Sequence, residues 1–256
     1  MENIQDNPES QEKALITYVI DCRRHAKNQD VKEISDFESS LTEKGIEKSE
    51  DLAISRPSVS TGDSYVSEFP RTRQTVESIR QGEWGMPEDA EPEKINETAR
   101  LRGKDIYSNH EFRKKYFTVA HEKGHASAAQ WFLNHKDQRP EDAPISPKEM
   151  AAGYASVIND LVLELKGKEP AQKTEIIPKT IVSHDLNMEA FLFYTIGEQS
   201  ENFMEQIGQI SKLDGFKIIL DKKGNEIIGK LKFKDILYVL DLDKLQELAN
   251  KYFSSK

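Results

Sequence analysis

The sequence predicts a three-layer α/β/α sandwich around a mixed, largely parallel sheet. Three short apolar and β-branched segments, residues 14–21, 63–67 and 180–183, indicate buried strands. Segments with helix-start signals or helical periodicity separate these strands. Strands that alternate with helices are typical of α/β folds. The 256 residues are enough for one sizeable core.

The N-terminal part begins with a polar lead-in, residues 1–13, that we expect to be disordered. Residues 14–21 (ALITYVID) then form the first strand, because the run is dense in β-branched side chains and short. A helix is predicted to start near residues 41–46, where Thr42 can cap the unpaired backbone amides.

The second strand, residues 63–67, leads directly into a predicted helix over 70–80. Pro70 falls in the first turn of this helix, where its missing N–H removes no hydrogen bond. Residues 81–115 are rich in glycine, proline and charge, which predicts an irregular excursion above the edge of the sheet.

Two further helices are predicted over 117–134 and 146–166 from their apolar spacing. The third strand, 180–183, is followed by a helix over 187–196, which Gly197 is placed to end. The pattern therefore keeps alternating between strand and helix up to this point.

The C-terminal part predicts a β-hairpin that turns at Lys223-Gly224-Asn225, more strand, and a last helix over about 242–252. We expect one domain over 14–256. Its cap spans about 81–150, and its C-terminal hairpin and helix span about 215–253.

Composition excludes several classes of protein. A formal net charge of −9 argues against a nucleic-acid-binding protein. We find no apolar run of membrane-spanning length and no signal-peptide pattern, so no membrane association is expected. The single cysteine, Cys22, fits a reducing compartment. These features predict a soluble, cytoplasmic protein.

Three short strings of the sequence combine into one candidate phosphate site. They are residues 24–26 (RHA), 67–75 (SEFPRTRQT) and 183–185 (SHD), and each follows a predicted strand. Strand ends in α/β folds converge on one edge of the sheet, where ligands bind. Two arginines and two histidines gathered there would bind a phosphoryl group, and neutral imidazole is a nucleophile that can accept phosphorus.

These strings resemble the motifs of the histidine phosphatase (phosphoglycerate mutase-like) superfamily. Residues 24–26 correspond to its Arg-His-Gly, and residues 41–45 (LTEKG) to its leucine-threonine-x-x-glycine helix start. Residues 67–75 correspond to Ser-Pro-Leu-x-Arg-x-x-Gln-Thr, and 183–185 contain the closing histidine. The resemblance covers roughly residues 14–197 in the right order, and implies a phosphoglycerate mutase-like fold.

The resemblance implies a phosphomonoester hydrolase that acts through a phosphohistidine on His25. Arg24, Arg71 and His184 would bind the substrate and hold the oxygens of the phosphoryl group, whose charge is spread in a loose transition state. This chemistry requires no metal and no cofactor. The substrate would be a small phosphorylated molecule or a phosphoprotein.

A carboxylic acid must also protonate the leaving oxygen and later activate water. Glu97 resembles the leucine-x-glutamate acid of the family, and Asp185 matches the His-Asp pair of the acid phosphatase branch. We expect Glu97 to serve, with Asp185 as the alternative.

Two other functions use the same residues. A phosphoglycerate mutase-type phosphotransferase would return the phosphoryl group to its product instead of releasing phosphate. A non-catalytic domain would only bind a phosphorylated ligand. This alternative stays open because Ala26 replaces the usual glycine after the nucleophile, and because Lys27 stands where an acidic residue is common.

A second motif points to zinc. The string HEKGH contains His121, Glu122 and His125 in the H-E-x-x-H pattern. On one helix the two imidazoles would share a face, and Glu122 would be the general base for zinc-bound water. A third ligand could be Glu141 or Glu149. A zinc hydrolase is therefore an outside alternative function. If the string binds no zinc, it is a charged, solvated segment of helix.

Overall fold

The computed structural model describes residues 14–29, 39–55, 62–82, 94–101, 109–169, 173–197 and 201–254. The lead-in over 1–13, which we expect to be disordered, lies outside these residues. Within the part that the structure describes, no helix is both long and apolar enough to cross a lipid bilayer.

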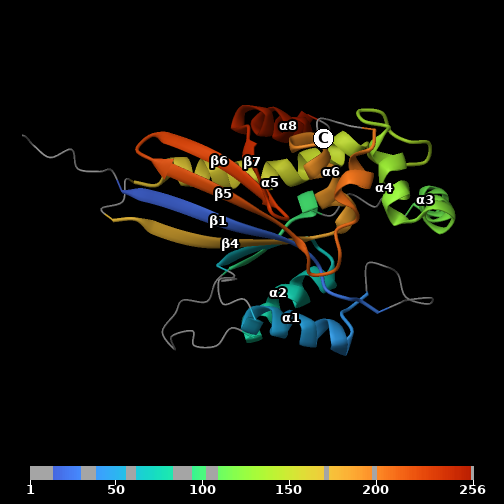
Figure 1. Cartoon of the computed structure of the whole chain (residues 1–256), viewed down its shortest axis with the longest axis horizontal. Coiled ribbons are helices and arrows are strands. Elements are labelled where there is room, and N and C mark those ends of the chain that lie inside the picture. The colour runs from blue at the N-terminus through green and yellow to red at the C-terminus, as the bar shows by residue number, and fades with distance from the viewer. Residues whose placement is uncertain are drawn as a thin grey trace, which may run out of the picture.

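A seven-stranded mixed sheet forms the middle layer (Figure 1), in the order β3-β2-β4-β1-β5-β6-β7. β3, β2, β4 and β1 run parallel, whereas β5, β6 and β7 continue the sheet antiparallel. The strands are β1 (Leu15–Arg24), β2 (Asp63–Val66), β3 (Ile95–Glu97), β4 (Glu175–Ser183), β5 (Gly215–Lys223), β6 (Glu226–Phe233) and β7 (Ile236–Leu240). The predicted α/β class and mixed sheet are confirmed.

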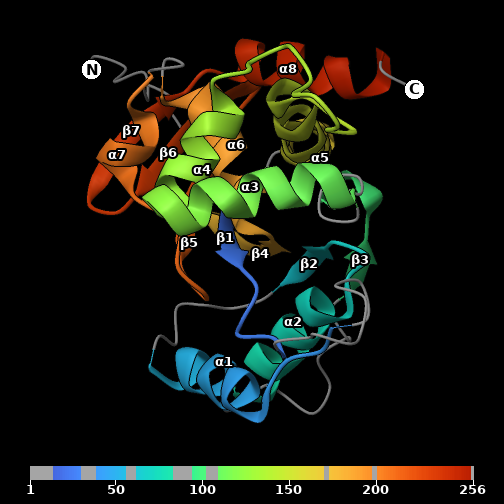
Figure 2. The same cartoon turned by 90° about the vertical axis from the view of Figure 1, so that its right-hand side faces the viewer.

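Helices cover both faces of the sheet, as the sandwich requires. α1 and α2 lie on one face, and α5, α6 and α8 lie on the other (Figure 1). Figure 2 shows α3 and α4 passing across the ends of β1 and β4. The helices are α1 (Glu43–Ser55), α2 (Pro70–Gly82), α3 (His110–Lys123), α4 (His125–Leu133), α5 (Pro147–Gly167), α6 (Asp185–Thr195), α7 (Phe203–Ile207) and α8 (Leu242–Ser254).

The main core lies between the sheet and α5, α6 and α8. The ring of Tyr154 packs on that of Phe191 at 4.9 Å, and Phe191 stacks on Phe216 of β5 at 5.7 Å. All three side chains are buried. Ser146 caps α5 in a reciprocal pair of hydrogen bonds with Glu149, so the helix that presents this core begins at a defined residue.

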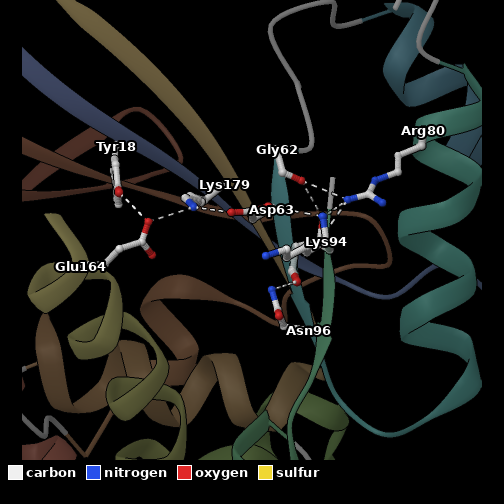
Figure 3. A network of polar contacts seen from close by, with 9 residues as sticks. Tyr18, Gly62, Asp63, Arg80, Lys94, Asn96, Glu164 and Lys179 are labelled. Carbon is white, nitrogen blue, oxygen red and sulfur yellow. Dashed lines mark hydrogen bonds and ion pairs between the residues drawn. The ribbon is translucent and has the colours of Figure 1, made fainter. Parts of the chain in front are cut away.

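A polar network connects the parallel strands β1, β2 and β4 to α5 (Figure 3). The buried Lys179 of β4 donates to Asp63 of β2 at 2.8 Å and to Glu164 of α5 at 3.3 Å. Tyr18 of β1 donates its hydroxyl to the same Glu164 at 2.7 Å. Because the ammonium is buried, the two carboxylates are needed to compensate for its lost hydration. The network therefore ties three parallel strands to the helix above them.

Two expectations about the cap are wrong. Within the predicted irregular excursion, β3 pairs in parallel with β2, and α3 starts at His110. Three residues of edge strand carry no apolar pattern of their own, so only the pairing reveals them. The single helix expected over 117–134 is two helices, because Gly124 adopts φ 89° between α3 and α4.

Candidate active site

Two adjacent parallel strands place the two histidines. β1 ends at Arg24 and β4 at Ser183, and these residues are register partners. The amide of His25 donates to the Ser183 carbonyl at 3.0 Å, so His25 and His184 leave the sheet side by side. Their ring centroids lie 5.1 Å apart, and both side chains are buried. The predicted convergence of these strand ends is confirmed.

Arg71 reaches the same point from the first turn of α2. Its Nε lies 3.3 Å from His25 Nε2, and its Nη2 lies 3.5 Å from His184 Nδ1. Its guanidinium also sits 4.4 Å from the centre of the Phe69 ring. The hydroxyl of Ser67 bonds His184 Nε2 at 2.9 Å, which orients that ring. Ser67, Phe69 and Arg71 of this segment therefore contact the two histidines.

The hydrogen bonds of His25 define its tautomer. Nδ1 lies 2.8 Å from the carbonyl oxygen of Ala26, and a carbonyl can only accept. Nδ1 therefore carries the proton, and the lone pair is on Nε2. Arg71 and Lys212 donate toward this atom, with Lys212 Nζ at 3.1 Å. The imidazole is thus presented as a nucleophile.

Arg24 is held rigidly at the edge of the site. Its Nη2 pairs with Asp185 Oδ2 at 2.8 Å, and its Nη1 donates to the carbonyl of Ile210 at 2.7 Å. Its Nε is buried and has no hydrogen-bond partner among the described residues. A buried N–H without a partner is costly, and an anion in the site would satisfy it.

Burial and neighbouring cations keep both histidines neutral. Burial is the largest cause that lowers the pKa of His25 well below its usual value, and the charges of Lys212, Arg71 and Arg24 lower it further. Burial also lowers the pKa of His184 well below its usual value, with Arg71 next in effect. The site consequently carries positive charge from arginine and lysine, and uncharged imidazoles.

A first prediction concerns stability and pH. In the unfolded chain both histidines titrate near pH 6.5 (roughly), whereas the fold keeps them neutral to lower pH. The unfolded state then binds more protons, so the free energy of unfolding should fall as pH drops from about 7 to about 5. Each histidine should contribute up to about 1.4 kcal/mol per pH unit. Urea unfolding of the wild type across this range measures the slope.

The control for this prediction is the double variant His25→Asn/His184→Asn, which has neither imidazole. It should lose the part of the slope that the two histidines contribute. An unchanged slope in the double variant would contradict the burial of two neutral histidines.

The four predicted phosphate ligands line one cavity of about 420 Å³. This volume is enough for a phosphoryl group together with part of an organic leaving group. Helices α3 and α4 contribute one wall through Arg113, Tyr116, Phe117 and His125. The Arg113 guanidinium lies 5.7 Å from the centre of the Phe117 ring.

The two candidate acids lie in different places. Glu97 ends β3 and pairs with Arg73 Nε at 2.7 Å, and its side chain is 45% exposed. It is not among the residues that line the cavity, whereas Asp185 is. Burial raises the pKa of Asp185, but the charges of Arg24 and Lys212 outweigh burial and lower it overall. Asp185 is therefore an ionised carboxylate at the edge of the anion site.

A second buried carboxyl group stands one turn further along α6. Burial raises the pKa of Glu189 to about 8, and the nearby Asp185 carboxylate adds to the rise. Its Oε1 accepts a hydrogen bond from the Ile210 amide at 3.2 Å. Of these two coupled groups, Asp185 holds the charge because it is paired with Arg24, and Glu189 holds a proton.

The zinc motif does not have the geometry that it needs. His121 lies in the last turn of α3, Gly124 interrupts the helix, and His125 starts α4. Glu141 pairs with Lys115, and Glu149 pairs with Arg139. Across the ranges that the structure describes, no three His, Cys, Asp or Glu side chains group in a way that could hold a metal ion. The residues therefore do not fit a zinc site.

Lys212 and Asn28 are site residues that the sequence analysis missed. Lys212 Nζ lies 3.4 Å from Asn28 Oδ1, and both line the cavity. Asn28 follows His25 by three residues, and this closeness in sequence to a motif residue is a signal that could have identified it. Lys212 lies in a polar segment before β5, and nothing in its local sequence distinguishes it from other lysines.

The comparison with protein families agrees with this geometry. The family model described as "Histidine phosphatase superfamily (branch 1)" matches residues 22–214. The chain belongs to this superfamily. A search of curated proteins finds no match.

Solved structures share the fold of this chain at low sequence identity. A structure titled "Mycobacterial hydrolase 1" is 15% identical with a TM-score of 0.54, covering 88% of this chain and 100% of its own. The phosphate complex of a mycobacterial glucosyl-3-phosphoglycerate phosphatase is 15% identical with a TM-score of 0.55, covering 86% and 97%. Bacillus stearothermophilus YhfR is 16% identical with a TM-score of 0.52, covering 83% and 94%. These likenesses show the fold.

The departure of this chain from the family motif at Ala26 costs no backbone strain. Ala26 is not among the described non-glycine residues with positive φ, and its amide donates to Thr75 Oγ1 at 3.0 Å. Gly45 of the leucine-threonine-x-x-glycine motif is required by packing, because a Cβ there would collide with the carbonyl oxygen of Lys27. That motif therefore supports the loop that follows His25.

Proposed function

We propose that this chain hydrolyses phosphomonoesters through a phosphohistidine intermediate on His25. The observation that carries the proposal is the lone pair of His25 Nε2, which faces the cavity beside Arg71 Nε at 3.3 Å. A neutral, buried imidazole next to fixed cations suits attack on an anionic phosphoryl group.

The reaction has two steps. Nε2 forms a bond to phosphorus as the bond from phosphorus to the leaving oxygen breaks, and an acid gives that oxygen a proton. Water then attacks the phosphohistidine, a carboxylate takes its proton, and inorganic phosphate leaves with His25 restored. Arg24, Arg71 and His184 hold the oxygens that stay on phosphorus, so side chains supply the stabilising charge and no metal is required.

We propose Asp185 as the acid and base, in place of Glu97. The proposal is supported by the position of Asp185 on the cavity, whereas Glu97 is paired with Arg73. Asp185 is ionised beside Arg24, whose charge lowers its pKa. A bound phosphoryl group adds negative charge beside it and competes for Arg24, which raises the pKa of Asp185 toward that of a useful acid.

Asp185→Asn should lower kcat by about 10²–10³ for an alkyl phosphate, because a poor leaving group depends on protonation. The loss should be much smaller for p-nitrophenyl phosphate, whose leaving group departs as an anion. Steady-state kinetics with both substrates measure the difference.

Glu97→Gln is the matched variant for the carboxylate and should leave both rates within about threefold of the wild type. If Glu97→Gln instead shows the large loss that depends on the leaving group, Glu97 is the acid and the assignment to Asp185 is wrong.

The test of the function is turnover of a panel of small phosphomonoesters in the presence of a chelator. Release of inorganic phosphate, with a phosphoenzyme trapped by rapid quench into alkali, supports the proposal. Transfer of labelled phosphate within the substrate without its release identifies a mutase. Binding of phosphate without any turnover identifies a non-catalytic domain, and loss of turnover in chelator contradicts metal independence.

A further inference from the structure

We propose that Lys212 is a catalytic residue that binds the transferring phosphoryl group, a role that rests on the proposed function of the site. It adds a third cation to the two arginines and two histidines that the sequence motifs contain. Its Nζ lies 3.1 Å from His25 Nε2, the atom that would attack phosphorus.

The backbone around Lys212 is fixed to the strand that carries the nucleophile. The amide of Leu213 donates to the carbonyl of Arg24 at 3.1 Å, and the amide of Arg24 donates to the carbonyl of Asp214 at 2.9 Å. Arg23 Nη1 also donates to the Leu213 carbonyl at 2.8 Å. The segment before β5 therefore holds Lys212 in register with the end of β1.

The ammonium stands where the substrate must enter. In-line attack places phosphorus about 3 Å from Nε2, which is close to the present separation of Nζ and Nε2. An arriving phosphoryl group must displace the ammonium from Nε2. The flexible four-carbon stem allows Lys212 to turn aside and donate to a phosphoryl oxygen while its backbone stays in place.

A cation at this position would act mainly in the transition state. Phosphoryl transfer spreads negative charge over three oxygens that stay on phosphorus, and positioned donors stabilise this charge in a site shielded from water. Arg24 is already bonded to Asp185 and Ile210. Lys212 brings its charge to the attacking atom itself, with Nζ 3.1 Å from His25 Nε2.

The experiment compares Lys212→Met and Lys212→Arg with Lys232→Met, which removes the same charge from an exposed position on β6. Circular dichroism and thermal unfolding establish that each variant folds. Lys212→Met should lower kcat/KM for p-nitrophenyl phosphate by about 10²–10³ and weaken vanadate inhibition by a similar factor. Lys212→Arg should recover part of both, and Lys232→Met should match the wild type.

Three outcomes would overturn the inference. One is a Lys212→Met enzyme with turnover and vanadate affinity within about threefold of the wild type. Another is a loss of turnover in Lys212→Met with vanadate affinity unchanged. A third is an equal loss in Lys232→Met. If the wild type has no turnover at all, the proposed function fails, and calorimetric binding of vanadate to the same variants still decides whether Lys212 holds the anion.

Discussion

Replacing His25 by alanine should reduce kcat/KM for phosphomonoester hydrolysis by at least about 10⁴, the largest effect expected for any single side chain here. Without Nε2 no phosphoenzyme can form, and the remaining cations can only bind substrate. Phosphate release from p-nitrophenyl phosphate measures the loss, and alkaline quench should trap no covalent phosphate on the variant.

The control is His110→Ala, which removes an imidazole from the exposed start of α3. This variant should keep wild-type turnover and phosphoenzyme. A His25→Ala protein that retains more than about a tenth of the activity, or that still forms a phosphoenzyme, would remove His25 from the role of nucleophile.

Replacing Arg71 by methionine should lower kcat/KM by about 10³, because Arg71 reaches both histidines and its planar fork matches two phosphoryl oxygens. Arg71→Lys should recover little, since a point charge does not reproduce the fork. Phosphate affinity should fall in parallel. The measurement is steady-state kinetics together with calorimetric titration of inorganic phosphate.

The same helix offers a matched control. Arg73 lies two residues further on, with its side chain 42% exposed and paired with Glu97 and Glu77. Arg73→Met should change kcat/KM by less than about threefold. Equal losses in Arg71→Met and Arg73→Met would mean that removing any positive charge from α2 is enough to lower kcat/KM. Arg71 would then not be a specific ligand of the phosphoryl group.

Removal of one of these cations should lower activity but raise the free energy of unfolding. Arg24, Arg71 and Lys212 bring three positive charges to a cavity that holds two neutral histidines and one carboxylate, Asp185, so positive charge is in excess there and favours an anion. In such sites the repulsion between like charges lowers the free energy of unfolding. The function and the stability of this edge of the sheet are therefore opposed, and inorganic phosphate is the ligand expected to relieve the repulsion.

Local signals in the sequence were sufficient where a single segment decides the structure. The apolar runs of β1 and β4, Pro70 in the first turn of α2 and Gly224 in the C-terminal hairpin all lie in the elements that they predicted. Thr42 caps α1 through the amide of Gly45 at 3.1 Å, as its position indicates. Patterns of this kind act over one turn or one strand, so they predict an element without any knowledge of distant contacts.

Side-chain contacts could not be predicted where one residue or one distant contact changes the geometry. His121 and His125 have the spacing of zinc ligands, but the φ of 89° at Gly124 separates them into two helices. Glu97 has the position of an acid in its motif, yet its side chain pairs with Arg73. Spacing along a chain predicts side-chain proximity only while the backbone stays regular.

By itself the sequence determined the kind of fold and the meeting of two arginines and two histidines in one cavity, because strand ends in a parallel sheet must meet at one edge. Only the tertiary structure decided what completes the site. Lys212 reaches His25 because the β1–β5 pairing returns the chain beside the end of β1, 187 residues further along. Asp185 rather than Glu97 lines the cavity because α6 begins at that edge. Both results depend on contacts between segments that no local pattern encodes.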